Sequence, residues 1–197
     1  MPIDMKAIGV EMNHLIAERD FNGMIDKAGS IIDEHPSSYL GRWWMARTLT
    51  FMGRTDEALD WLMEAMKKAD SDEEESKISS SMANVYNVMK RWEDSLNYTS
   101  IALELNPRNV VGIIARSIAL SAIGKRKEAT RLLDSNQRLY VDDYQKACVA
   151  AVKRNKAKML EHLRNAVEGT PHSKVTVQYD PDFAPYRGDS EFKGVTS

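Results

Sequence analysis

The segments GRTDEA (53–58), KRWEDS (90–95) and GKRKEA (124–129) each place a polar turn directly before an amphipathic stretch of helix-forming residues. A shorter copy, RDF, stands at 19–21, and a degenerate copy, RNK, stands at 154–156. The first four turns follow one another at intervals of 34, 37 and 34 residues. A nearly fixed period of this length predicts a repeated unit made of a helix, a turn and a second helix.

The predicted units also end in a similar way, because an apolar stretch runs into a proline at IIDEHP (31–36), IALELNP (101–107) and AVEGTP (166–171). Proline ends a helix because it lacks the amide donor and restricts the residue before it. Between turn and proline, apolar residues recur at the spacing of one helix face. The clearest example is the set Ala58, Leu59, Leu62, Ala65 and Met66. The sequence therefore predicts an all-α protein.

Composition narrows the classes of function. The chain is 43% hydrophobic and 28% charged, which is ordinary for a globular protein. Its formal net charge of -2 supplies no field of one sign to attract nucleic acid. The apolar stretch 110–123 is interrupted by Arg116, and residues 1–10 lack the hydrophobic centre of a secretory signal. We therefore expect a soluble cytoplasmic protein with no nucleic-acid or membrane partner.

Small residues recur in the second helix of the unit, and they carry a resemblance to a known family. The 34-residue period, a small residue one turn into that helix, another seven residues later and a terminal proline resemble the tetratricopeptide repeat. The small residues are Ala58, Ser95 and Ala129, followed by Ala65 and Ala102. The segment 76–109 matches best, because Met82-Ala83 and Tyr86 stand at the family's large-small pair and aromatic position.

The resemblance covers about residues 5–173 and implies a right-handed α-solenoid of about five units, at roughly 5–38, 39–75, 76–109, 110–139 and 140–173. Residues 174–197 follow as a tail, in which DPDF (180–183) resembles a segment found after the last repeat in many prokaryotic members. An open solenoid leaves its final helix pair uncovered, so a terminal segment must cap it. We expect Phe183, Tyr186 and Phe192 to fill that role.

Candidates for catalysis or metal binding are scarce in the sequence. The four histidines, at 14, 35, 162 and 172, never stand at the i, i+4 spacing that places two imidazoles on one helix face. The single cysteine, Cys148, lies in an apolar stretch and has no adjacent base. The chain also lacks the glycine-rich loops that hold phosphates. These observations predict no catalytic residue, no metal site and no cofactor, so we do not expect an enzyme.

The resemblance implies that the first helix of each unit lines a concave groove. Arginine there could bind a carboxylate, tryptophan could anchor a partner and asparagine amides could hold a peptide backbone. Two alternatives stay open: either of the adjacent Trp43 and Trp44 could face the groove, and the groove could be solvated or filled by the protein's own tail. The candidate partner-binding residues are Asn13, Trp43, Arg47, Lys77, Asn84, Asn87, Ile114, Ile118 and Tyr144.

Chaperone-binding members of the family carry a two-carboxylate clamp of lysine, asparagine and arginine. This sequence departs from that clamp, because Trp44 and Ser81 stand at two of its positions. Binding to chaperone tails is therefore not expected.

These observations favour a non-catalytic scaffold or adaptor that binds a peptide or protein in its groove. One alternative is a nucleic-acid-binding helical repeat, which would need basic residues along the groove. Another is a regulatory or assembly subunit of an enzyme complex. The sequence allows a monomer or a homodimer.

Overall fold

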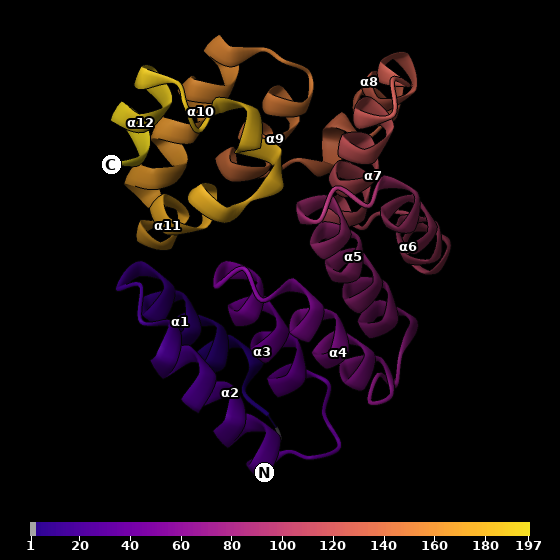
Figure 1. Ribbon diagram of the computed structural model, residues 1–197, viewed down its shortest axis with the longest axis vertical. Coiled ribbons are helices and arrows are strands. Elements are labelled where there is room, and N and C mark those ends of the chain that lie inside the picture. Colours follow the sequence, from indigo (N-terminus) through magenta and orange to yellow (C-terminus); the bar gives the residue numbers. More distant parts are fainter. Residues whose placement is uncertain (1–2) are drawn as a thin grey trace.

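The protein is built from helices alone over residues 3–197, which are the residues that the computed structural model describes (Figure 1). No strand occurs within this range, which confirms the all-α class. The helices are α1 (Met5–Ala17), α2 (Phe21–Glu34), α3 (Leu40–Phe51), α4 (Thr55–Met66), α5 (Asp72–Val88), α6 (Trp92–Leu105), α7 (Val110–Ala122), α8 (Arg126–Ser135), η1 (Gln137–Leu139), α9 (Asp143–Val152), α10 (Lys156–Gly169), α11 (Pro171–Tyr179), η2 (Pro181–Tyr186) and α12 (Ser190–Thr196). Within this part of the chain, no helix is both long enough and apolar enough to cross a membrane.

Consecutive helices pack as pairs from α1–α2 to α9–α10, and each pair packs on the next. The first helices also meet one another across pairs, since α3 contacts α5, α5 contacts α7 and α7 contacts α9. Helices α3, α5, α7 and α9 therefore form one continuous inner layer, whereas α2, α4, α6 and α8 are more widely separated from one another (Figure 1). This is the architecture of an α-solenoid.

One backbone geometry recurs at the five turn positions that the sequence aligns. The residue after the C-cap of each first helix has a positive φ, with values of 58° at Arg19, 75° at Gly53, 59° at Lys90, 88° at Gly124 and 59° at Arg154. The amide of the following residue then donates to the carbonyl five positions earlier, at 2.8 to 2.9 Å. This hydrogen bond defines the Schellman motif that ends helices. The turn therefore has the same backbone conformation in all five helix pairs.

The small residues of the second helices lie where two helices approach closely. Ala58, Ser95 and Ala129 are at most 1% exposed, and Ala65 and Ala102 are fully buried. A side chain larger than these would separate the helices, because protein interiors are close-packed. The family-like pattern of small residues is therefore a packing requirement of the pairs.

The C-terminal segment packs on the last helix pair. Phe183 is fully buried and Phe192 is 2% exposed, both in the hydrophobic cluster formed by α7 to α12. The partly buried Tyr186 donates its hydroxyl hydrogen bond to the carbonyl of Ala151, 3.1 Å away. The proposed boundary between residues 173 and 174 lies inside α11, and the division of the chain into units stays a prediction.

The same segment also reaches the first helix pair, which the sequence did not predict. Helix α11 packs against α1, and the two lie near each other in Figure 1 although they are far apart in the chain. Val175 belongs to the N-terminal hydrophobic cluster, whereas Val177, two residues later, belongs to the C-terminal one. The array of helix pairs therefore curves until its two ends meet, and α11 joins them.

Candidate functional site

Two inner helices bring cations and aromatic rings together in a group that we call the cationic–aromatic cluster, formed by Tyr39, Trp43, Arg47 and Lys77. Tyr39 precedes α3, Trp43 and Arg47 lie on α3, and Lys77 lies on α5. The spacing of four residues from Tyr39 to Trp43 to Arg47 places all three on one face of a helix. Tyr39 was not among the predicted groove residues, although this spacing identifies it.

The guanidinium of Arg47 lies among aromatic rings. Its Cζ is 5.7 Å from the ring centroid of Trp43, 5.3 Å from that of Trp44 and 5.6 Å from that of Phe51. Within residues 3–197, no carboxylate lies within the 4.0 Å of an ion pair with Arg47. The aromatic faces attract the cation without neutralising its charge. Arg47 is thus a charged group without an acidic partner.

Helix α5 adds a second cation to the cluster. Lys77 Nζ lies 4.1 Å from the ring centroid of Trp43 and donates a long hydrogen bond, 3.4 Å, to the hydroxyl of Tyr39. Trp43 Nε1 in turn donates to Ser81 Oγ at 2.8 Å. Both bonds join residues 38 positions apart, so α3 and α5 lie side by side in a fixed register. This register places both cations close to the indole ring of Trp43.

The charge of Arg47 acts on the protonation of its neighbours. Burial lowers the pKa of Lys77, and the neighbouring charge of Arg47 lowers it further, while Glu73 and Glu74 act in the opposite direction. Burial also lowers the pKa of Arg47, but a guanidinium in a protein stays protonated. Burial and the charge of Arg47 likewise lower the pKa of His172. The positive charge of this region is therefore centred on Arg47.

The C-terminal segment approaches this region through Asp180. The hydroxyl of Tyr144 donates to Asp180 Oδ2 at 2.9 Å. Tyr144 and Asp180 are the two groups whose charges raise the pKa of Arg47 against the effect of burial. A carboxylate from the protein's own tail thus lies near the cationic–aromatic cluster, outside ion-pairing distance.

The structure places the nine predicted groove residues in different surroundings. The structure brings Trp43, Arg47 and Lys77 together and links Tyr144 to the tail beside them. Asn13, Asn84 and Ile118 are partly exposed. Ile114 is 7% exposed and packs in the C-terminal hydrophobic cluster.

Asn87 is 2% exposed and donates its side-chain amide to the carbonyl of Ala115, 3.0 Å away on α7. Its amide therefore connects α5 to α7 and is not at the surface. The two adjacent tryptophans differ in their exposure. Trp44 is 5% exposed and packs in the core, whereas Trp43 is partly exposed.

A second group of polar side chains lies where α9 meets the tail. One potential ligand atom from each of Cys148, Asp180 and Asp182 lies within 4.8 Å of the other two. The sequence pattern predicted no metal site, because no two histidines share a helix face and Cys148 lies in an apolar stretch. The two aspartates are far from Cys148 in the chain, so only the fold could reveal this group.

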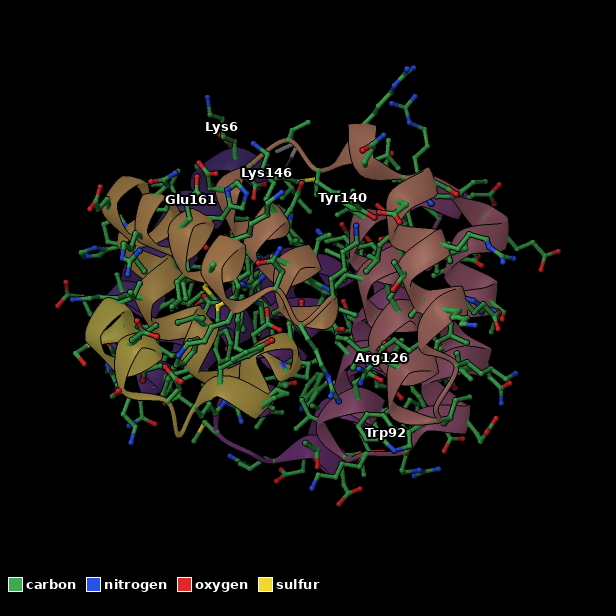
Figure 2. The ribbon with its side chains drawn as sticks, turned by 90° about the horizontal axis from the view of Figure 1, so that it is seen from above. Lys6, Trp92, Arg126, Tyr140, Lys146 and Glu161 are labelled. Carbon is green, nitrogen blue, oxygen red and sulfur yellow. The ribbon has the colours of Figure 1, made fainter. Side chains whose placement is uncertain are left out.

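A hollow of about 410 Å³ is lined by residues of η1, α9, α10 and the turns beside them, with Tyr140 and Lys146 among them. Figure 2 labels these two side chains. Two of its other basic groups are already paired. Lys153 forms an ion pair with Asp134, and His162 Nδ1 lies 2.8 Å from Asp143 Oδ1. Because these two side chains already contact carboxylates of the protein itself, the hollow is a weaker candidate site for an acidic ligand than the cationic–aromatic cluster.

Comparison with known proteins identifies the fold. No protein-family model matches the chain, and no curated protein matches it in sequence. Among solved structures, it is similar to MamA, with a TM-score of 0.52 and 12% identity over 98% of this chain and 99% of that one. It is also similar to a tetratricopeptide repeat protein from Parabacteroides merdae ATCC 43184, with a TM-score of 0.51 and 13% identity over 96% of this chain and 75% of that one.

A further similar structure is YrrB, described as a TPR protein with an unusual peptide-binding site. Its TM-score is 0.49 and its identity 17%, over 85% of this chain and 87% of that one. At these identities, the likeness to MamA and to the Parabacteroides protein concerns the fold alone. The chain therefore has a helical-repeat fold of the tetratricopeptide type.

Proposed function

We propose that this protein is a non-catalytic scaffold that binds an acidic segment of another protein at the cationic–aromatic cluster. The observation that carries the proposal is Arg47, a partly exposed residue whose guanidinium lies among three rings and has no carboxylate within ion-pairing distance in residues 3–197. A carboxylate from a partner would form charge-assisted hydrogen bonds with it, which are about twice as strong as neutral ones.

The rings next to Arg47 support a protein partner over a free anion. Trp43 is partly exposed, and its indole nitrogen is held by Ser81, so the ring has a fixed orientation. A fixed aromatic surface beside a cation suits an apolar side chain that follows an acidic one, because aromatic and arginine residues dominate binding energy at interfaces. Lys77 would add attraction at longer range.

A panel of synthetic peptides tests this proposal directly. Acidic peptides with a hydrophobic residue next to the carboxylate are titrated into the labelled protein and followed by fluorescence anisotropy. We expect binding of the acidic peptides and at least tenfold weaker binding of the same peptides with glutamine and asparagine in place of the acids. We expect binding to weaken as salt rises, because the attraction is electrostatic.

The matched variants are Arg47→Met and Arg116→Met. Arg116 lies on α7 and donates to Ser100 Oγ at 2.8 Å, away from the aromatic rings of the cluster. The first variant should lower affinity at least tenfold and the second should leave it unchanged. Equal binding by wild type and Arg47→Met would exclude the cluster as the binding site. Tighter binding of single-stranded RNA than of any peptide would instead favour the nucleic-acid alternative.

A further inference from the structure

The group formed by Cys148, Asp180 and Asp182 lies inside the protein. Cys148 lies on α9, Asp180 is the N-cap of η2, and Asp182 lies in η2. Cys148 is 3% exposed and Asp182 is 8% exposed, whereas Asp180 is partly exposed. A thiol and two carboxyl groups therefore meet at one point, where Asp180 is the least buried of the three residues.

Asp182 is a buried acid without a cationic partner. In the part of the chain that the structure describes, no backbone amide and no lysine, arginine or histidine side chain hydrogen-bonds its carboxylate. The groups that face it are the carboxyl of Asp180 and the thiol of Cys148. A buried carboxylate must be paired or bind a cation, or it takes up a proton.

The surroundings of the group match those of a metal site. Both oxygens of Asp180 already accept a hydrogen bond, Oδ1 from the amide of Asp182 at 3.0 Å and Oδ2 from the hydroxyl of Tyr144 at 2.9 Å. These bonds fix the carboxylate and leave a lone pair on each oxygen, as is usual for carboxylates that bind metals. Three anionic ligands around a divalent ion would leave one negative charge, on the same side as the Arg47 guanidinium, whose pKa the charge of Asp180 raises.

We propose that Cys148, Asp180 and Asp182 bind one divalent transition-metal ion, of which Zn²⁺ is the best fit. A thiolate with two carboxylates suits zinc, whereas magnesium and calcium prefer oxygen ligands alone. The ligand atoms must move closer together than they lie in this structure, since zinc binds sulfur at about 2.3 Å and carboxylate oxygen at about 2.0–2.2 Å. Three protein ligands leave the fourth position for a water molecule.

Metal binding would release the proton of the thiol and any proton held by Asp182. A coordinated thiol is deprotonated by the ion itself, so the burial that raises the pKa of Cys148 does not prevent binding. The bound ion would connect α9 to the segment between α11 and α12. It would therefore fix the tail to the last helix pair more firmly than apolar packing alone.

Cobalt provides a specific probe, because Cys148 is the single cysteine of the chain. The full-length protein is treated with a chelator and then titrated with Co²⁺ under reducing conditions. We expect one equivalent to produce a thiolate-to-cobalt absorption band in the near ultraviolet and tetrahedral bands in the visible range. Addition of Zn²⁺ should remove both. Co²⁺ binding without the thiolate band would place the ion elsewhere and overturn the proposal.

Three variants complete the test. Cys148→Ser should abolish the thiolate band, and Asp182→Asn should lower Co²⁺ affinity at least tenfold. Asp189→Asn is the matched control, because Asp189 lies in the same tail, caps α12 and pairs with Lys156 outside the group. It should bind like wild type. Zn²⁺ should raise the melting temperature of wild type and Asp189→Asn but not of Asp182→Asn, and an equal rise in all three would contradict the proposal.

Discussion

The ring of Tyr179 meets the ring of Phe21 edge-on, with 5.7 Å between their centroids and an angle of 89° between their planes. Tyr179 ends α11 and Phe21 begins α2, so this contact joins the last part of the array to its first pair. Phe51 completes a group of three rings, with its centroid 5.4 Å from that of Tyr179 and 5.9 Å from that of Phe21. Tyr179 of the tail thus contacts one aromatic ring from each of the first two helix pairs.

Tyr179→Ala should open the junction between α11 and α1. Removal of the ring loses two aromatic contacts, and we expect stability to fall by about 2 kcal/mol, less than for a fully buried aromatic residue. Hydrogen exchange of the α1 amides should accelerate. The control is Tyr98→Ala, which removes a ring stacked 5.4 Å from Tyr86 between α5 and α6. If α1 exchanges equally fast in both variants, the junction does not depend on Tyr179.

Substitution by alanine should have opposite effects on stability at two glycines, Gly41 and Gly29. A Cβ at Gly41 would lie 2.8 Å from Ile32 Cγ1 and 2.9 Å from the carbonyl oxygen of Ala28. Gly41→Ala should therefore lower the free energy of unfolding by about 1–3 kcal/mol, the usual cost of overpacking. Gly29 meets nothing within 4 Å, so Gly29→Ala should raise it by about 0.5–1 kcal/mol through helix propensity. Urea unfolding of both variants measures the difference, and equal effects would contradict the packing.

The repeated turn predicts a second pair of opposite effects. Gly53 and Lys90 occupy the same position of their turns, with φ of 75° and 59°. Gly53→Ala should destabilise the protein by about 1 kcal/mol, because a Cβ is unfavourable in the left-handed region. Lys90→Gly should stabilise it by up to about 1 kcal/mol for the same reason. Thermal unfolding of the two variants checks both signs.

Alkaline pH should destabilise the protein through two buried phenols. Burial raises the pKa of Tyr39 to about 12, with Glu74, Glu73 and Asp70 adding to the effect, and burial with Asp134 raises that of Tyr140 to about 12. An unfolded tyrosine titrates near pH 10, so between about pH 10 and 12 the unfolded state releases a proton that the folded state keeps. The stabilisation is complete below pH 10 and is lost as the pH rises toward 12.

The variants Tyr39→Phe and Tyr140→Phe isolate this effect. Each lacks one of the phenols, so its free energy of unfolding should fall less steeply between pH 10 and 12 than that of wild type. Urea unfolding at several pH values measures the slope. Lysine ionisation is common to all three proteins and cancels in the comparison. Parallel slopes would show that the two hydroxyls ionise alike in the folded and unfolded states.

The sequence predicted the features that depend on neighbouring residues. The turn positions at Arg19, Gly53, Lys90, Gly124 and Arg154 were aligned from their spacing, and all five adopt one backbone motif. The small residues of the second helices were recognised from the same period. Local signals of this kind are repeated in every unit, which is why one sequence suffices to detect them.

Features that depend on the accumulated curvature were not predicted. The contact of α11 with α1 arises only when several helix pairs add their rotations, and no single segment encodes it. Asn87 was predicted to face the groove, but it lies on the face of α5 that meets α7, a difference that its spacing along the helix did not reveal. The meeting of Cys148 with the tail aspartates depends on the same long-range geometry.

The junction of α11 with α1 also determines how the protein responds to mechanical force. A pull applied between these two helices passes straight through their contact, and the hairpins between them bear no tension while it holds. In an array whose ends did not touch, the same pull would put every hairpin under tension as soon as it was applied. The protein should therefore yield first in a single opening event at Tyr179, and its hairpins should unravel one after another only afterwards.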